Sequence, residues 1–569
     1  MTFVNDLKCS SITLNLDISG LFAPGMKDGN DTIAYENQGR TYYFSRSAVN
    51  DMDERVSSAT KLGMNVTGVL TPWKGTKNGV MTERVTDRWP SYMSYEENQA
   101  STAVPLTGIN TSGTEGEHAF EALMEFMADR YSRNMDQGFI QTFVVSNEID
   151  FTPYFCTGMD FDGYMEEYTR CLRIANTAVK KYCADMNVAV PFTHYWNGTG
   201  TNVGFGSATN FSPRKMLDWM NKHLIEEGDF DWAVCPHLYS ATSTSSAYAL
   251  ADSKSGQVTG NVETSKLLTF SNLEIIDEYL KRPENMYMGK NVRWVYLNEG
   301  DVSSSSGAEK NMNEQAASLL QAYCKASQFS EIKQYNYYRL LDNEEFETGS
   351  GLNVGLLNAD WSMKPAYYAY KHIDDEQSQA LIKHYMPYIS FRKNKKILTY
   401  ENGISSVPDM MAVTDSKINW IEKYDPDKVI RRSLRQPKAD IKKMTIPRIG
   451  VQSYSGDELK PDIAVMDGRK RATVKITYSK NINPGTATAV IRGIGRYTGR
   501  RTVRFKIIKR SYDTESSAHG IIPKQSKLPE KKESEKKVEK KTVKETEKKN
   551  EKKNVRKGSV LSFLLGLFR

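Results

Sequence analysis

The sequence predicts an α/β protein built on a (β/α)8 barrel of the TIM type. Along residues 1–400, apolar and β-branched segments of strand length alternate with amphipathic segments of helix length, which is typical of a parallel sheet with crossover helices. Two apolar segments, QTFVVSNEIDF from Gln141 and VRWVYLNEGD from Val292, run into an Asn-Glu pair. Because the carboxyl ends of parallel barrel strands converge on one mouth, these polar residues mark a candidate site.

The strand count is one short of a closed eight-stranded barrel. We expect strands at residues 11–16, 64–70, 141–146, 188–193, 232–237, 292–298 and 332–338. The missing first strand is expected upstream of Met1 rather than within the Gly-, Thr-, Ser- and Asn-rich residues 74–115, which are placed as a loop over the barrel mouth. The strand at 11–16 should therefore pair on one side only.

Helices are expected between these strands. Apolar spacing predicts a helix over 52–62 that Gly63 ends, and others from His118, over 162–181, 213–225, 315–329 and 365–373. Asp162 is interpreted as an N-cap in preference to a metal-binding DxD pair with Asp160. Ser271 with Glu274 resembles a capping box.

The charge of the chain is concentrated at its C-terminal end. The net charge is +7, but residues 521–569 alone hold 14 Lys, 2 Arg and 7 Glu, a net +9, which leaves −2 for the rest. The folded part is therefore near neutral, and no nucleic-acid partner is implied. The six cysteines show no CxxC or Cys/His zinc spacing and are interpreted as buried small residues.

No signal peptide is visible at the N-terminus, and no apolar run reaches the ~18 residues of a membrane-spanning helix. Four regions are expected: a (β/α) barrel at 1–400, a linker at 401–439, a small all-β Ig-like sandwich at 440–510 and a disordered Lys/Glu-rich tail at 511–569 with a short apolar end.

Two glutamates at two strand ends have the chemistry of glycoside hydrolysis, which uses a pair of carboxyl groups. Glu148 or Glu299 alone is more often a helix N-terminal charge or a loop residue. Together, each closing a strand, they indicate an active-site pair. We expect their carboxylates within ~5 to 6 Å of each other, the spacing of a retaining enzyme, whereas a wider gap would indicate inversion.

The Asn147-Glu148 strand end, the His237-x-Tyr239 strand end, Glu299 and the closing run GLLNADWSMKPAYYAYKHI resemble clan A retaining glycoside hydrolases. Residues 1–400 more closely resemble the bacterial barrel family catalogued as domain of unknown function 5722. The resemblance implies that Glu148 is general acid/base, that Asn147 binds the sugar 2-hydroxyl and that Glu299 is the nucleophile. It further implies that Tyr239 orients Glu299, with His237 beside it.

Further substrate-binding candidates stand at other strand ends. Trp73, Trp196, Asn197 and Tyr337 are predicted to contact sugar, Tyr337 in the region where the clan often has a tryptophan, with Trp361 as a possible substitute. Trp73 and Trp196 are about as well explained by core packing. His194 and His237 are better explained as hydrogen-bonded residues of the mouth than as metal ligands, because no third ligand stands near them in sequence.

The C-terminal stretch from SYSGDELKPDIAVMDG to RRTVRFKI is similar to a β-sandwich repeat of bacterial surface proteins, which implies a spacer or a weak ligand binder. The basic tail and its apolar end are interpreted as a solvated spacer or as a tether to the cell wall or an anionic membrane. An extracellular or cell-surface location is therefore expected.

The interpretation is a retaining glycoside hydrolase that acts on a poly- or oligosaccharide and needs no metal or organic cofactor. The alternative is a non-catalytic carbohydrate-binding or adhesin-type surface protein on the same barrel, because fold alone does not fix activity.

Overall fold

The computed structural model describes residues 2–23, 25, 29–77, 80–85, 88–95, 105–133, 136–200, 210–344, 347–348, 351–430, 439–467, 470–494 and 497–509. The tail expected at 511–569 lies outside these residues.

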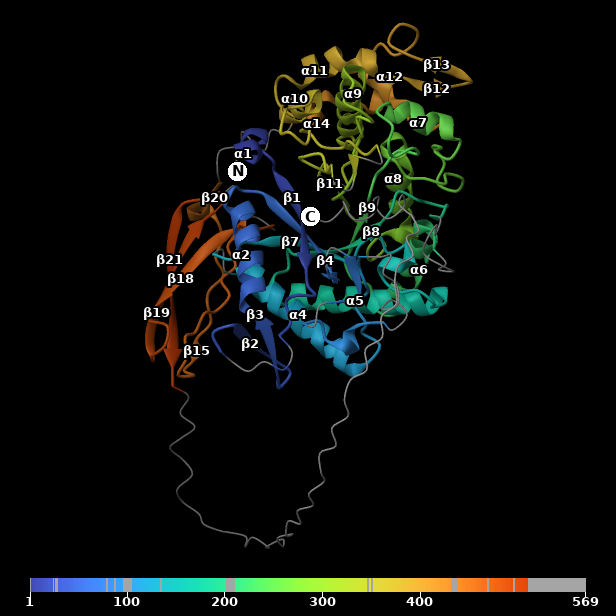
Figure 1. Ribbon diagram of the computed structural model, residues 1–569. Helices are drawn as coiled ribbons and strands as arrows, with labels where there is room; N and C mark the ends of the chain where they lie inside the picture. Colours follow the sequence, from blue (N-terminus) through green and yellow to red (C-terminus); the bar gives the residue numbers. More distant parts are fainter. Residues whose placement is uncertain are drawn as a thin grey trace, which may run out of the picture.

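A curled parallel sheet of seven strands forms the centre of the protein, in the order β1-β4-β7-β8-β9-β10-β11 (Figure 1). Its strands are β1 (Ser11–Asp17), β4 (Asn65–Thr71), β7 (Ile140–Val145), β8 (Asn187–Phe192), β9 (Ala233–Pro236), β10 (Val295–Leu297) and β11 (Ile332–Tyr335). All seven coincide with strands predicted from the sequence, and the TIM-type fold class is confirmed.

Helices connect the strands and cover the outside of the sheet (Figure 1). They are α2 (Arg46–Lys61), α4 (Thr114–Arg133), α5 (Phe161–Tyr182), α6 (Pro213–Glu226), α7 (Tyr248–Ser255), α8 (Glu274–Leu280), α9 (Glu309–Ala326) and α10 (Pro365–Lys371), with α1 (Thr2–Leu7) before β1. Gly63 follows α2 at φ +80°, a left-handed conformation that favours glycine.

Two predicted helix caps are wrong. The N-cap of α5 is Asp160, whose side chain accepts a hydrogen bond from the Gly163 N–H at 2.8 Å, because the helix begins one residue before Asp162. The capping box near α8 joins Thr269 and Asn272 of a preceding 3-10 helix and does not involve Ser271 and Glu274 as a pair.

Side chains of the barrel strands alternate between two environments, as the pleat of a strand requires. Six buried residues form an apolar cluster of their own, and their strand neighbours pack in the main core with the helices. The cluster consists of Val69, Val144, Ala189, Ala233, Cys235 and Tyr296.

The region between β1 and β11 is held by polar side chains. Among the described residues, β1 pairs only with β4 and β11 only with β10. Asn336, just after β11, bridges the gap: it accepts from the Ser11 hydroxyl at 2.5 Å, and its Nδ2 donates to Thr13 Oγ1 at 2.7 Å. Thr13 in turn donates to the Asn298 carbonyl at 2.7 Å. These bonds replace a backbone ladder at the seam of the barrel.

Two hairpins stand in the loops that follow β1 and β4. They are β2 (Thr32–Asn37) with β3 (Arg40–Ser45), and β5 (Lys74–Lys77) with β6 (Val80–Val85). The second hairpin lies within the predicted loop at 74–115, and it forms a sheet of its own.

The predicted linker at 401–439 is partly wrong. Helices α12 (Val407–Met411), α13 (Trp420–Lys423) and α14 (Pro426–Val429) bury Met410, Trp420 and Val429 in the main core. Apolar residues at 410, 411, 420 and 429 are too widely spaced to form a helical period, so this packing was not visible in the sequence. Helix α11 (Ser378–Tyr385) and the hairpin of β12 (Phe391–Lys393) and β13 (Lys396–Leu398) precede them.

A smaller all-β unit follows, with its own buried cluster around Ile441, Val465 and Ile491. A four-stranded sheet in the order β15-β21-β19-β18 lies beside two two-stranded sheets. The strands are β14 (Ala439–Asp440), β15 (Gln452–Ser453), β16 (Met466–Asp467), β17 (Lys470–Arg471), β18 (Val474–Ser479), β19 (Gly485–Gly493), β20 (Tyr497–Thr498) and β21 (Arg500–Ile508). Figure 1 shows this unit in orange and red beside α2.

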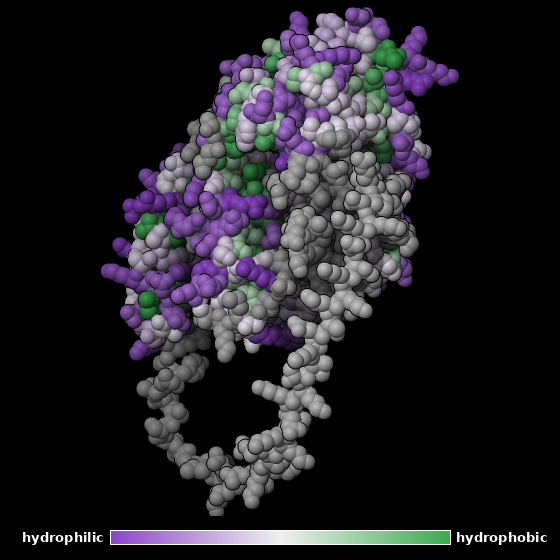
Figure 2. All heavy atoms as spheres, viewed as in Figure 1, coloured by the Kyte–Doolittle hydropathy of each residue, from purple (hydrophilic) through white to green (hydrophobic). Residues whose placement is uncertain are grey.

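The surface visible in Figure 2 is mainly hydrophilic, and the cysteines form no disulfide. On the coloured part of the face in Figure 2, hydrophilic residues dominate and hydrophobic residues form small separate patches. All six cysteines are free thiols, and five of them are buried, as predicted. Within the described ranges, none of the helices combines the length and apolar character needed to cross a membrane.

Removing the polar bridge across the seam should destabilise the barrel. Asn336→Ala removes the acceptor of the Ser11 hydroxyl and the amide that donates to Thr13 Oγ1, so we expect the free energy of unfolding to fall by about 1–3 kcal/mol. Urea unfolding measures this, with Asn358→Ala as the control, because Asn358 makes an exposed hydrogen bond to Ser362. Equal losses in the two variants would contradict a role for Asn336 in closing the barrel.

Candidate active site

The chain leaves β7 through a turn of unusual backbone conformation that carries the first glutamate. Ser146 has φ 69° and Glu148 has φ 40°. Positive φ is uncommon for residues other than glycine, and such strain gathers at functional sites. Asn147 lies between them and is buried.

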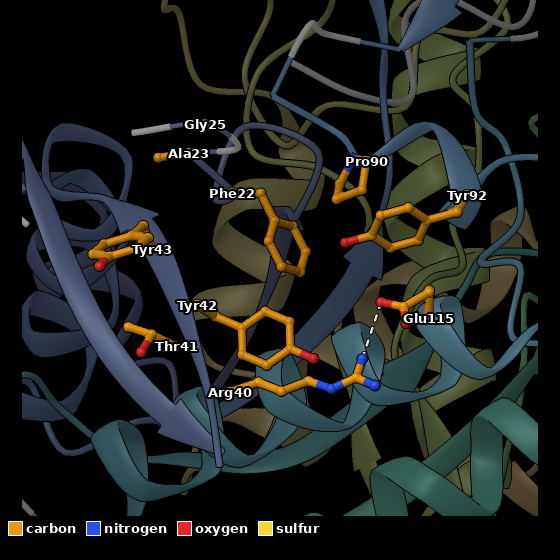
Figure 3. A pocket seen from close by; sticks show the side chains of 10 residues that line it. All are labelled: Phe22, Ala23, Gly25, Arg40, Thr41, Tyr42, Tyr43, Pro90, Tyr92 and Glu115. Atoms are coloured by element: carbon orange, nitrogen blue, oxygen red, sulfur yellow. Dashed lines mark hydrogen bonds and ion pairs between the residues drawn. The ribbon is translucent and has the colours of Figure 1, made fainter. Parts of the chain in front are cut away.

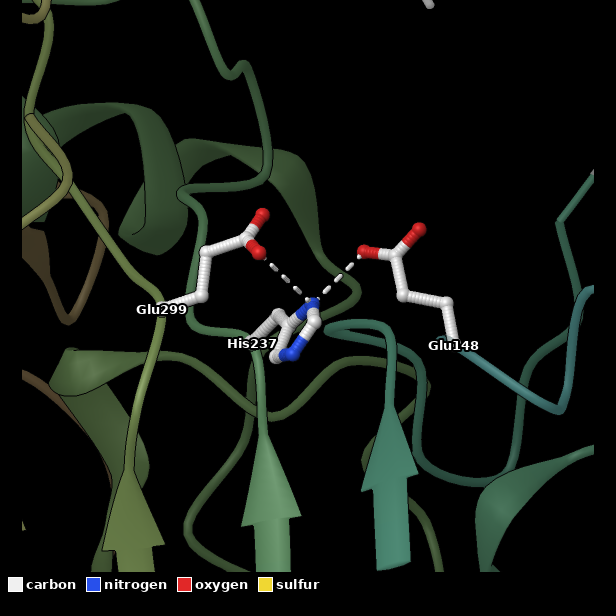
Figure 4. Close-up of side chains that lie close together, drawn as sticks. All are labelled: Glu148, His237 and Glu299. Atoms are coloured by element: carbon white, nitrogen blue, oxygen red, sulfur yellow. Dashed lines mark hydrogen bonds and ion pairs between the residues drawn. The ribbon is translucent and has the colours of Figure 1, made fainter. Parts of the chain in front are cut away.

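Three strand ends bring Glu148, His237 and Glu299 together (Figure 4). His237 Nδ1 lies 3.0 Å from Glu148 Oε1 and 3.6 Å from Glu299 Oε2. The Tyr239 hydroxyl donates to Glu299 Oε1 at 2.7 Å. One oxygen of Glu148 and one of Glu299 lie within 4.8 Å of each other. The structure thus gathers four of the residues that the sequence predicted, from β7, β9 and β10.

His237 carries a positive charge in this environment. Its side chain is fully buried, which alone lowers the pKa of an imidazole, but the carboxylates of Glu299 and Glu148 outweigh burial and raise the pKa of His237 to about 9. At neutral pH the ring is therefore an imidazolium whose Nδ1 proton points at the two glutamates.

Glu299 is subject to opposing influences. Burial raises the pKa of Glu299 above its ordinary value, and the charge of Glu148 adds to this rise. The imidazolium of His237 and the hydroxyl of Tyr239 act in the opposite direction, because both stabilise the carboxylate. These two neighbours therefore favour the ionised form of Glu299 and partly offset the effect of its burial.

Among the described residues, Glu148, His237 and Glu299 form the group whose donor atoms lie close enough together to hold a metal ion. An imidazole must lose its proton to bind a metal. Because the pKa of His237 is raised to about 9, a metal ion that binds here at neutral pH has to displace this proton.

A cavity of about 730 Å³ opens beside Glu299 and runs along the gap between β1 and β11. Trp73, Asn298 and Tyr337 line it together with Glu299. The Trp73 indole donates to Thr71 Oγ1 at 3.2 Å, and the Tyr337 hydroxyl donates to the Val354 carbonyl at 2.8 Å. Both rings are therefore fixed at the wall of the cavity.

Two residues predicted to contact sugar form hydrogen bonds to a neighbouring loop. The Trp196 side chain is 1% exposed, and its indole donates to the Val262 carbonyl at 2.8 Å. Asn197 Nδ2 donates to the carbonyls of Val262 and Ser265, each at 2.8 Å. Both side chains therefore hold the loop before α8 in place. Residues at a strand end can contact neighbouring loops as well as a ligand. Trp361 stacks on Phe3 instead, with ring centroids 5.9 Å apart.

Three polar residues near the site were not among the predicted substrate contacts. Asp17 and Asn298 line the cavity, and both amide atoms of Asn298 are buried without a hydrogen-bond partner in the part of the chain that the structure describes. Asp150 is fully buried behind Glu148; burial raises its pKa to about 7, and it accepts from the Thr193 N–H at 2.8 Å. Asp17 and Asn298 stand at strand ends, which was the available signal.

His194 lies close to the trio without joining it. Its ring stacks on Tyr195 at 4.8 Å and meets Tyr239 edge-on at 6.1 Å. Burial lowers the pKa of His194 to about 4, so this histidine is neutral where His237 is charged.

Comparison with known proteins gives a family for most of the chain. Residues 1–397 match the model of a family described as "Family of unknown function (DUF5722)". No curated protein matches. The C-terminal β unit lies outside the matched residues.

Several solved structures are similar at low identity. One is a family 39 glycoside hydrolase from Bacteroides cellulosilyticus WH2, with a TM-score of 0.40 and 16% identity over 65% of this chain and 59% of that chain. Another is a glucosidase from Croceicoccus marinus, with a TM-score of 0.38 and 11% identity over 72% of this chain and 66% of that chain. A third is xylanase 10B from Thermotoga maritima, with a TM-score of 0.35 and 12% identity over 68% and 98%. This chain thus spans about three fifths of the first of these.

The charge on His237 makes stability depend on pH. A pKa raised from 6.5 to about 9 on folding stabilises the protein fully below pH 6.5, and this contribution is lost as pH rises through 9. We expect the difference in unfolding free energy between wild type and His237→Asn to shrink from pH 6 to pH 9.5. Urea unfolding across this range measures it, with the exposed His384→Asn as control. A difference that does not change with pH would contradict the charged state.

Proposed function

We propose that this chain, which belongs to the Family of unknown function (DUF5722), is a glycoside hydrolase that cleaves a poly- or oligosaccharide by retaining double displacement. The observation that carries the proposal is the pair of carboxylates at converging strand ends, with one oxygen of each within 4.8 Å of the other. Retaining enzymes hold their two carboxyl groups about 5–5.5 Å apart, whereas inverting enzymes need about 6.5–9.5 Å to admit a water.

In the first displacement, Glu299 attacks the anomeric carbon and forms a glycosyl ester. The bond from that carbon to the leaving oxygen breaks, and Glu148 gives its proton to this oxygen. The leaving sugar departs with a new hydroxyl group, and Glu148 is left as a carboxylate.

In the second displacement, Glu148 takes a proton from a water, and the water oxygen attacks the anomeric carbon. The ester bond to Glu299 breaks, so Glu299 leaves as a carboxylate and Glu148 regains its proton. Two inversions give a product with the configuration of the substrate.

Tyr239 and His237 support this sequence from the ends of the same sheet. Tyr239 holds Glu299 Oε1 at 2.7 Å, which fixes the carboxylate for attack and favours its ionised form. His237 places a positive charge 3.0 Å from Glu148 and 3.6 Å from Glu299, which stabilises the Glu299 carboxylate before attack and the Glu148 carboxylate after it has given up its proton. The indole of Trp73 and the ring of Tyr337 supply apolar faces to the cavity beside Glu299, and Asn298 adds a polar side chain to its lining.

The test is hydrolysis of a polysaccharide panel, followed by proton NMR of the first sugar released. We expect wild type to release product with retained anomeric configuration. Glu299→Gln and Glu148→Gln should each lose about 10³-fold or more of the rate, because each removes a reacting group. The matched control is Glu422→Gln, an exposed glutamate of α13, which should keep the wild-type rate.

Three results would contradict the proposal. An inverted first product would show direct attack by water. Full activity of Glu299→Gln would show that Glu299 is not the nucleophile. Saccharide binding by wild type without any hydrolysis would favour the carbohydrate-binding protein over the enzyme.

A further inference from the structure

A second hollow lies in the loops at the same end of the barrel as the two glutamates. It measures about 310 Å³ and shares no lining residue with the cavity beside Glu299. One wall comes from β3, which follows β1, and another from a short 3-10 helix, Ser91–Met93, which follows β4. Both segments follow carboxyl ends of barrel strands, so the walls of the hollow belong to loops at the end of the barrel that carries the active site.

Aromatic rings make up the body of this hollow (Figure 3). Phe22 forms its floor: the side chain is 4% exposed and is held edge-on by Trp89, with centroids 5.9 Å apart. Tyr42 and Tyr92 stand around it, and Tyr92 is 46% exposed. A large ring left half in solvent beside a fixed aromatic floor offers a flat apolar face to a ligand.

Paired charges form the rim on one side. Arg40 Nη1 lies 2.9 Å from Glu115 Oε2, and the two side chains are 41% and 63% exposed. Arg40 also lies beside the Tyr42 hydroxyl. A guanidinium has five N–H donors and a carboxylate accepts at two oxygens, so this pair keeps donors and acceptors for neighbouring hydroxyl groups.

The combination of flat aromatic faces with a planar donor and acceptor pair fits a pyranose ring, which presents apolar C–H faces and a rim of hydroxyls. The volume of about 310 Å³ is at the lower end of the range of about 300–1,000 Å³ for ligand pockets. It therefore suits one or two sugar units and not a folded partner.

We propose that the hollow formed by Phe22, Tyr42, Tyr92, Arg40 and Glu115 is a second saccharide-binding site. A sugar ring stacks on Tyr92 above the buried floor that Phe22 forms, while its hydroxyls bond to Arg40 and Glu115. The choice of a saccharide as ligand rests on the proposed function. The site holds a remote part of a polysaccharide on the face where Glu148 and Glu299 cleave it.

Affinity electrophoresis of the full chain in gels that contain xylan, β-mannan or β-glucan tests this site. The variants are made on Glu299→Gln, so that no polysaccharide is consumed. With the polysaccharide that retards the parent most, Tyr92→Ala and Arg40→Met should each raise the apparent Kd at least threefold. Tyr92→Phe keeps the ring and should bind as the parent does, which separates loss of stacking from misfolding. The control is Tyr400→Ala, which removes a tyrosine of similar exposure, 45%, outside the hollow.

Equal retardation of Tyr92→Ala, Arg40→Met and the parent overturns the second site, and so does a parent that none of the three polysaccharides retards. Hydrolysis of a short oligosaccharide by otherwise wild-type protein separates the two proposals. Tyr92→Ala should leave this rate unchanged, because a short substrate reaches only the active site. If wild type hydrolyses nothing while Tyr92→Ala loses retardation, the proposed reaction fails and the second site stands.

Discussion

The buried imidazolium of His237 between two glutamates is the interaction on which the mouth of this barrel depends. Taking two carboxylates and an imidazole out of water is costly, and it is tolerated only where the charges are paired and hydrogen-bonded. His237 Nδ1 faces Glu148 at 3.0 Å and Glu299 at 3.6 Å, and Tyr239 binds the far side of Glu299. Loss of the central cation would leave a buried carboxylate without its counter-charge, so the protonation states of the three side chains depend on one another.

The sheet is what makes this unit possible. β7, β9 and β10 are parallel members of one sheet, so their carboxyl ends deliver side chains to one place, although Glu148 and Glu299 are far apart in the chain. The interior of the barrel is apolar around Val144 and Ala189 but polar at the seam, where Asn336 links β1 to β11. The cavity beside Glu299 follows this seam. The side chains that close the barrel therefore also line the space available to a substrate.

The strands and the glutamate pair could be predicted because both follow from local rules. β-Branched runs of strand length predict the seven strands, and an Asn-Glu pair that follows two such runs, as at Glu148 and Glu299, predicts a pair of carboxylates at one end of the sheet. Contacts between distant loops could not be predicted. The Trp196 indole is buried by the carbonyl of Val262, and Trp420 packs into the main core from a predicted linker, neither of which leaves a periodic signal. The charge state of His237 depends on two residues that lie far from it in sequence.

The central claim is that Glu299 forms a covalent bond to the sugar, and mass spectrometry of a trapped intermediate tests it most directly. A 2-deoxy-2-fluoro glycoside with a good leaving group slows both displacements but the second more strongly, so the glycosyl-enzyme accumulates. Wild-type protein treated with gluco, xylo and manno forms of such a reagent should gain the mass of one glycosyl group, located on the peptide that contains Glu299. An adduct on another residue, or no adduct from a sugar that the enzyme demonstrably hydrolyses, would contradict the account.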